Sequence, residues 1–180
     1  GCPHADSYAA VRVALAEFPE SVVTSDIGCY TLGALPPYSA IESCVCMGAS
    51  VGMAKGAADA GLRPALAVIG DSTFLHSGVT PLMDAVAAGT PMTLLILDNG
   101  TVAMTGLQPT VLSGSRLEPL LLGLGVPREH LHVVEVAPKR PAALAGLLRR
   151  ELEHPGVSVV VAVRECVELA KTVRREGDKA

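Results

Sequence analysis

The chain has 180 residues, 49% of them hydrophobic, so it is long enough to bury one substantial core and too short for two ordinary domains. Its formal net charge is −4 and its basic residues are scattered, which argues against nucleic acid or an anionic membrane as a partner. Aromatic residues make up only 3% and Trp is absent, so Ala, Val, Leu and Gly must fill the core, as they do where helices pack on a parallel sheet. We therefore expect one α/β domain over residues 1–180.

Localisation and the role of the cysteines follow from what the chain lacks. No apolar run approaches the roughly 20 residues of a membrane-spanning helix, and the first residues do not have the character of a signal peptide. These features predict a cytoplasmic protein. Five cysteines without an export signal argue against a disulfide framework and favour buried thiols or metal ligands. Because the chain opens on Gly1-Cys2 without an initiator Met, we expect it to be a fragment of a longer one.

The first third of the chain predicts a helix, a strand and a second helix. Apolar residues have helical spacing over 8–18, and β-favouring residues follow over 21–25. Residues 47–60 are rich in Ala and Gly, with glycines four positions apart at Gly48, Gly52 and Gly56. One face of this predicted helix is almost bare, so we expect another element to approach it closely.

The rest of the chain alternates between strand and helix patterns. Continuous apolar runs predict strands buried on both faces, at 65–69, 92–97 and 157–163. Thr80 and Pro81 predict the N-cap and first turn of a helix that Gly89 ends.

A fourth strand is expected near 132–136, before a helix at about 141–152, and the polar tail from Arg174 to Ala180 is expected to fray. The alternation predicts an open, mostly parallel sheet with helices on both faces.

Two strand ends carry the most informative side chains. Gly70-Asp71-Ser72 ends one predicted strand and Asp98-Asn99 ends the next, which places Asp71 and Asn99 28 positions apart. The carboxyl ends of neighbouring parallel strands border one crevice, so both side chains are expected to reach a common ion. Mg²⁺ prefers oxygen ligands at about 2.0–2.1 Å and is often held by a carboxylate together with substrate phosphates. The alternative is that Asp71 and Asn99 are ordinary turn residues.

A Gly-Asp pair followed at this distance by Asn resembles the motif of thiamine diphosphate enzymes. Further stretches narrow the resemblance: Gly1-Cys2-Pro3-His4, the segment from Ser25 to Gly33, and the long block from Cys46 to Pro109. Together they are similar to the large subunits of indolepyruvate ferredoxin oxidoreductases and, more distantly, to the β-subunits of other 2-oxoacid ferredoxin oxidoreductases, over residues 1 to about 166.

The resemblance implies the diphosphate-binding domain of the thiamine diphosphate-binding fold. It also implies an oxidoreductase reaction, in which a 2-oxoacid, with arylpyruvates as the first candidates, is oxidatively decarboxylated. The products are an acyl-CoA and electrons for ferredoxin, and the cofactor carries the carbanion chemistry.

The resemblance assigns binding roles as well. The magnesium ligands would be the side chains of Asp71 and Asn99 and the backbone carbonyl of Thr101. Further residues are expected to bind the diphosphate. They would do so by close backbone approach, through hydroxyls, through free helix amides or from a closing loop, and they are Gly48, Ala49, Ser50, Gly70, Ser72, Thr73 and Thr105. His76 is the candidate catalytic contact to substrate or pyrimidine, with a hydrogen-bonded scaffold histidine as the alternative.

The cysteines divide into two sets. By resemblance, Cys2, Cys29 and Cys166 match three of the four thiolate ligands of a 4Fe-4S cluster, and the fourth would precede the chain. The alternative is that these are small buried hydrophobic residues. Cys44 and Cys46 are expected to be core thiols on opposite faces of a strand.

One part of a thiamine enzyme is missing from the sequence. In this family the carboxylate that activates the aminopyrimidine comes from a separate pyrimidine-binding domain or subunit, and we find no second domain. The chain alone is therefore expected to bind the cofactor weakly and to be inactive until an oligomeric interface, formed in part by the Gly/Ala helix, completes the site.

Two alternatives of different kinds stay open. A non-oxidative thiamine diphosphate decarboxylase or synthase half would share Asp71 and Asn99 but would have no use for the cluster cysteines. A noncatalytic interaction domain would bind no cofactor. A Rossmann dinucleotide domain is disfavoured, because no Gly-x-Gly-x-x-Gly follows the first strand.

Overall fold

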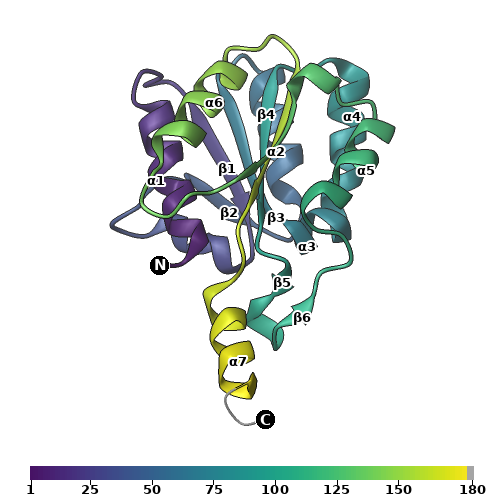
Figure 1. The fold of residues 1–180 in the computed structure, drawn as a ribbon. Helices are drawn as coiled ribbons and strands as arrows, with labels where there is room; N and C mark the ends of the chain where they lie inside the picture. The colour runs from purple at the N-terminus through teal and green to yellow at the C-terminus, as the bar shows by residue number, and fades with distance from the viewer. Residues whose placement is uncertain (178–180) are drawn as a thin grey trace.

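The computed structural model describes residues 1–177 (Figure 1). They contain a six-stranded parallel sheet in the order β2-β1-β3-β4-β8-β7. The strands are β1 (Val22–Asp26), β2 (Ser43–Val45), β3 (Ala65–Gly70), β4 (Met92–Asp98), β7 (Leu131–Glu135) and β8 (Val157–Val163). A short antiparallel pair, β5 (Thr101–Val102) and β6 (Gln108–Pro109), follows the carboxyl end of β4. The predicted parallel sheet is confirmed.

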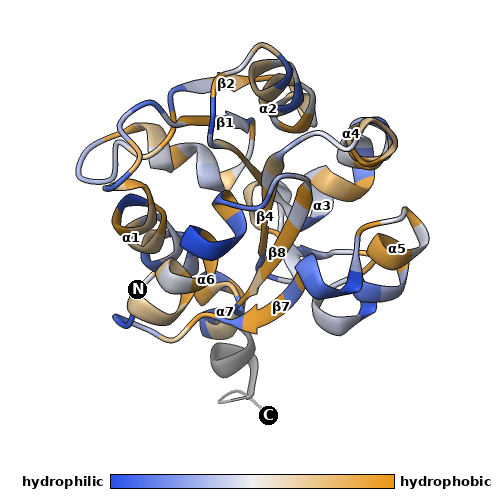
Figure 2. Ribbon diagram, turned by 90° about the horizontal axis from the view of Figure 1, so that it is seen from above, coloured by the Kyte–Doolittle hydropathy of each residue, from blue (hydrophilic) through white to orange (hydrophobic). Residues whose placement is uncertain are grey.

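Helices cover both faces of the sheet, as predicted. The α-helices of the described residues are α1 (Pro3–Leu15), α2 (Ala49–Asp59), α3 (Asp71–Thr73), α4 (Val79–Ala88), α5 (Glu118–Gly123), α6 (Ala142–Leu152) and α7 (Val167–Gly177). Helices α1 and α6 lie on one face, and α2, α4 and α5 lie on the other (Figure 2). Strand β3 serves both cores, because Leu66 and Val68 point toward the first face while Ala67 and Ile69 point toward the second. No helix within the described residues is long and apolar enough to cross a membrane.

The two ends of the chain differ from expectation. Helix α1 begins at Pro3 and not near Tyr8, because the fixed φ of proline suits the first helical position and Asp6 in the first turn favours the helix dipole. Helix α7 continues to Gly177, so the start of the tail that was expected to fray is helical. The remaining residues of that tail, 178–180, lie outside the described part of the chain.

The helix expected to begin at Thr80 begins much earlier. Helix α3 starts at Asp71 and runs through a π-helical turn, Phe74–Gly78, directly into α4. Thr80 is therefore not an N-cap. The π turn lies just before Pro81, which has no N–H to donate to the carbonyl four residues back. The predicted end is confirmed, since Gly89 has φ +61° in the left-handed region.

The bare face of α2 is not covered by the described residues. A side chain at Gly52 or Gly56 would meet nothing within 4 Å, so no other element of the described residues approaches this face, and an oligomeric interface there stays a prediction. The helix instead buries its other face through Val51, Ala54 and Ala58. Only Gly48 is closely approached, by Ser77 of the π turn.

The prediction that Cys44 and Cys46 are core thiols is also wrong. Both thiols are exposed. Strand β2 is the edge of the sheet and pairs only with β1, so neither face of β2 is packed as deeply as the central strands.

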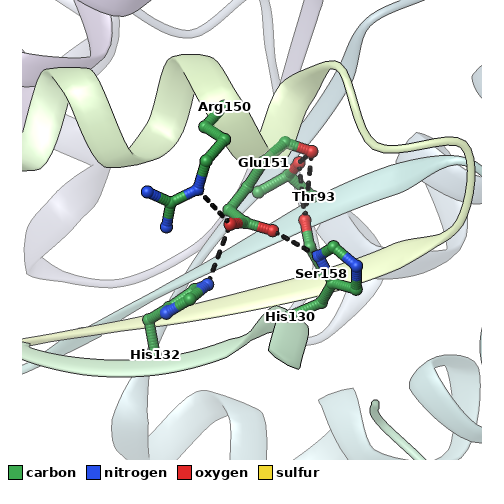
Figure 3. Close-up of polar contacts among 6 residues, drawn as sticks. All are labelled: Thr93, His130, His132, Arg150, Glu151 and Ser158. Atoms are coloured by element: carbon green, nitrogen blue, oxygen red, sulfur yellow. Dashed lines mark hydrogen bonds and ion pairs between the residues drawn. The ribbon is translucent and has the colours of Figure 1, made fainter. Parts of the chain in front are cut away.

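A polar cluster lies at the amino ends of the strands, the edge opposite to the carboxyl ends of β3 and β4. We call Thr93, His130, His132, Arg150, Glu151 and Ser158 the Glu151 network (Figure 3). The Glu151 carboxylate is 2% exposed and contacts both imidazoles at 2.8 Å, while Arg150 donates to it at 3.1 Å. The hydroxyls of Thr93 and Ser158 donate to the Glu151 backbone carbonyl. The network thus joins the end of α6 to β4, β7 and β8.

Tyr8→Phe is expected to lower the free energy of unfolding by about 1–2 kcal/mol, because it leaves the carbonyl of Tyr30 without the buried hydroxyl that donates to it. For a domain of this size the melting temperature should fall by roughly 3–6 °C. Thermal unfolding followed by circular dichroism measures this. Tyr38→Phe, which removes a hydroxyl from the partly buried neighbouring ring, is the matched control. Equal shifts in the two variants would contradict the assignment.

Candidate functional site

A cavity of about 270 Å³ lies at the carboxyl ends of β1, β3 and β4. These strands surround the point where the chain order reverses, since β2 lies to one side of β1 and β3 to the other. Such a switch point is the usual place for a ligand in an open α/β sheet. The cavity is lined by His4, Ile27, Gly28, Cys29, Tyr30, Met47, Gly70, Asp71, Ser72, Thr73, Leu97, Asn99, Thr101, Val102, Ala103, Met104 and Thr105.

Asp71 and Asn99 meet at this cavity, as the sequence predicted. Asp71 begins α3 and accepts a hydrogen bond from the Gly100 amide at 3.1 Å. Asn99 follows β4, and its Oδ1 accepts from the Thr101 amide at 3.1 Å in a local turn. Asp71 is 3% exposed and Asn99 is 7% exposed, so both present side-chain oxygen atoms in a largely water-excluded site.

Asp98 holds the loop that follows β4. Its carboxylate accepts from the Gly100 amide at 3.0 Å, from the Ser113 hydroxyl at 2.7 Å and from the Gly114 amide. Burial, and then the nearby Asp98 carboxylate, raise the pKa of Asp71 well above its ordinary value. A cation bound between such carboxylates would relieve this repulsion. Asp98 was assigned no role from its sequence context, although its place beside Asn99 at a strand end was a usable signal.

A second group of polar side chains, two of which line the cavity, supports its wall. His4 is 5% exposed, and burial lowers its pKa to about 4, so its ring is neutral. Its edge meets the Tyr30 ring at 6.3 Å and 89°, and the Tyr30 hydroxyl donates to Asp26. Asp26 is fully buried and also accepts from the amides of Gly48 and Ser50 and from the Ser50 hydroxyl. Neither Tyr30 nor Asp26 was predicted from the sequence to be part of this site.

The amides expected to be free at the start of α2 are therefore in use. Gly48 and Ser50 donate to Asp26, and the Ala49 amide donates to the Cys46 carbonyl at 3.0 Å. None of these three residues lines the cavity. These amides are therefore not free donors in this structure, since a buried carboxylate and a backbone carbonyl of the chain accept from them, and contact of the three residues with the diphosphate stays a prediction.

Seven of the predicted cofactor-binding residues do line the cavity: Gly70, Asp71, Ser72, Thr73, Asn99, Thr101 and Thr105. The reason for the glycine at position 70 differs from expectation, since a Cβ there would lie 2.5 Å from the Tyr30 ring. His76 lies outside the lining, is exposed, and contacts the Ser77 hydroxyl at 2.9 Å.

The three cysteines of the predicted cluster differ in exposure and in their relation to the cavity. Cys29 lines it, Cys166 is buried and Cys2 is exposed. Burial raises the pKa of Cys29, and the nearby thiols of Cys166 and Cys2 raise it further. Within residues 1–177, however, no three His, Cys, Asp or Glu side chains are grouped as ligands of one metal ion. The thiols are neighbours but do not form a ligand set.

The thiamine pyrophosphate enzyme, C-terminal TPP binding domain family matches residues 26–162, a span that contains the Asp71 and Asn99 site. The chain belongs to this family. Its TPP-binding domain is 41% identical to the indolepyruvate oxidoreductase subunit IorA of Archaeoglobus fulgidus and 37% identical to that of Methanothermobacter thermautotrophicus. These alignments cover 98% and 97% of this chain, and the chain spans about 30% of the length of each relative.

Solved structures support the fold of this TPP-binding domain. A 2-oxoglutarate:ferredoxin oxidoreductase from Magnetococcus marinus superposes with a TM-score of 0.72 at 21% identity, over 92% of this chain and 62% of the other. A thiamine diphosphate-dependent 4-hydroxybenzoylformate decarboxylase from Rhodococcus jostii gives 0.64 at 20% identity, over 89% of this chain and 32% of the other. At these identities the likeness establishes the thiamine diphosphate-binding fold alone.

Proposed function

We propose that this domain binds thiamine diphosphate through Mg²⁺ as part of a 2-oxoacid ferredoxin oxidoreductase that oxidatively decarboxylates an arylpyruvate such as indolepyruvate to an acyl-CoA. The observation that carries the proposal is the convergence of Asp71 and Asn99 on one cavity at the ends of β3 and β4. Carboxylate and amide oxygens are the donors that Mg²⁺ takes beside phosphate groups. We place the enzyme in the cytoplasm.

The residues present fit the cofactor. Asp71, the Asn99 side chain and the Thr101 carbonyl would hold Mg²⁺, while Ser72 and Thr73, which follow Asp71 in the first turn of its helix, would donate to the diphosphate. Thiamine diphosphate supplies the electron sink for decarboxylation when it is bound. The residues of this chain would hold and orient the diphosphate end of the cofactor.

The cavity wall favours a substrate with an apolar side chain. Ile27, Met47, Leu97, Val102 and Met104 form much of the lining, and the lining contains no lysine or arginine from the described residues. A second carboxylate on the substrate would find no counter-charge from this chain, whereas an aromatic side chain would be desolvated against Met and aliphatic groups.

The site needs a further domain. Asp71 is the one carboxylate that the described residues contribute to the lining, and it is assigned to the metal, so the carboxylate that activates the aminopyrimidine must come from elsewhere. Exposed apolar side chains beside the cavity leave an apolar surface that a pyrimidine-binding domain or subunit would cover: Ile27, Met47 and Met104. We propose that this assembly is an oligomer and that ferredoxin, CoA and the 2-oxoacid bind to it.

Calorimetric titration tests the proposal. Thiamine diphosphate is expected to bind weakly to this chain and more tightly after a pyrimidine-binding partner is added, and in both cases only with Mg²⁺ present. Binding that is equally strong in EDTA would contradict the metal-mediated site. No binding under any of these conditions would favour the noncatalytic interaction domain.

Iron content separates the oxidative enzyme from its non-oxidative rival. Cys2, Cys29 and Cys166 are the cluster ligands that the family resemblance proposes, although among the described residues they are not grouped as a ligand set. Iron bound by the assembled enzyme, together with 2-oxoacid-dependent reduction of ferredoxin, would support the oxidoreductase. An iron-free assembly that still decarboxylates the substrate would identify a decarboxylase.

A further inference from the structure

The orientation of the Asn99 side chain is fixed by its neighbours. The Thr101 amide donates to Oδ1 at 3.1 Å, so that atom must be the carbonyl oxygen and the NH₂ group must point the other way. Nδ2 lies 3.3 Å from Nε2 of His4. An amide NH₂ is only a donor, so Nε2 of His4 accepts from it and the ring proton is on Nδ1.

His4 is held firmly enough to fix this contact. It occupies the first turn of α1 and is 5% exposed, and the edge of the ring meets the Tyr30 ring. The same turn is tied to the chain after β8, since Arg164 pairs with Asp6 and donates to the Gly1 carbonyl at 2.8 Å. The imidazole therefore reaches Asn99 from a separate, anchored element 95 positions away in sequence.

We propose that His4 is a positioning residue for the metal site, which it serves by accepting the Asn99 Nδ2 hydrogen bond and thereby keeping the Asn99 carbonyl oxygen turned toward the bound cation. The inference rests on the proposed function, in which Asn99 is a metal ligand. Oδ1 has two lone pairs, of which the Thr101 amide takes one and leaves the other for the metal.

The need for such a group follows from the symmetry of the amide. A half-turn of the Asn99 side chain would exchange oxygen for NH₂ and present a donor to the cation. Nε2 of His4 disfavours the flipped state, because two acceptors, Nε2 and the Asn99 oxygen, would then face each other. Partners of metal ligands typically contribute 10- to 100-fold in metal affinity in this way.

Three replacements separate positioning from packing. In His4→Gln the side-chain amide can place its oxygen close to where Nε2 lies, so the acceptor is retained. In His4→Asn the side chain ends near the Nδ1 position and falls short of Asn99. In His4→Leu the volume is kept without any acceptor.

The affinity for Mn²⁺, as a paramagnetic substitute for Mg²⁺, is measured by electron paramagnetic resonance in the assembled enzyme with thiamine diphosphate present. We expect His4→Asn and His4→Leu to raise the Mn²⁺ dissociation constant by roughly 10- to 100-fold, and His4→Gln to stay close to the unaltered enzyme. His154→Gln makes the same chemical change outside the cavity lining and is expected to have no effect. Thermal unfolding of the metal-free proteins accompanies each titration.

The outcomes are distinct. Unchanged Mn²⁺ affinity in His4→Asn and His4→Leu would overturn the inference. Equal loss in all three variants would overturn it too, since rescue by glutamine is what separates positioning from packing. An Asp71→Ala arm tests the underlying site: if it binds Mn²⁺ normally, the proposed function itself fails. If Asp71→Ala loses binding while His4→Asn and His4→Leu do not, only the role of His4 is wrong.

Discussion

Replacing Asp71 with Ala is expected to weaken Mg²⁺-dependent binding of thiamine diphosphate by at least about 100-fold, because it removes the carboxylate among the proposed ligands. A diphosphate carries several negative charges, and the described residues bring no lysine or arginine to the lining of the cavity. The cation must therefore supply most of the attraction. Calorimetric titration with the pyrimidine-binding partner present measures the loss.

The fold itself should survive this change. Asp71 is buried beside Asp98, and its removal takes away a like charge without opening a large cavity. The metal-free variant should therefore melt at or above the temperature of the unaltered protein. Asp84→Ala removes a carboxylate whose side chain is 70% exposed and is expected to leave cofactor binding unchanged. Undiminished binding by Asp71→Ala would remove Asp71 from the site.

The largest effect on stability is expected at the opposite edge of the sheet, in the Glu151 network (Figure 3). Glu151→Ala should lower the free energy of unfolding by ~3 kcal/mol at pH 7, because a 2% exposed carboxylate that joins two imidazoles and Arg150 is lost. The melting temperature should fall by roughly 6–12 °C. Glu151→Gln keeps the shape and some of the hydrogen bonds, so its effect should be smaller. Equal effects of the two variants would show that the contacts of the carboxylate contribute little.

Glu151 also makes the free energy of unfolding depend on pH, in a direction that its contacts determine. Burial alone would raise the pKa of Glu151, but hydrogen bonding to His130 and the charge of His132, together with the other contacts, lower the pKa below its ordinary value of 4.5. The carboxylate therefore contributes stability above that ordinary value, and this contribution is lost as pH falls through the lowered folded pKa. The stability difference between the unaltered protein and Glu151→Gln should shrink as the pH falls below 4.5, the ordinary pKa of a glutamate. Urea unfolding at several pH values measures this, and a difference that grows below that pH would contradict it.

Local pattern was enough to identify the parallel core. The runs at 65–69, 92–97 and 157–163 are so continuously apolar that only burial on both faces suits them, and all three became central strands. The errors arose where local signals compete. Thr80-Pro81 has residue types typical of a helix start, but the helix begins at Asp71. A π-helical turn before Pro81 lets the helix continue past the proline. Cys44 and Cys46 alternate like core residues, but the position of β2 at the sheet edge left them exposed.

For the site, the sequence by itself determined that an Asp and an Asn would end neighbouring parallel strands, because strand order and chain direction place those ends on one edge of the sheet. Only the tertiary structure decided which other residues join them. Three different segments contribute His4, Tyr30 and Asp26 to the cavity or to the hydrogen bonds that support it. Asp26 accepts from helix amides that the sequence suggested would bind the diphosphate. The reason is physical: short-range spacing specifies which face or end of an element a residue occupies, whereas long-range packing specifies which donor meets which acceptor.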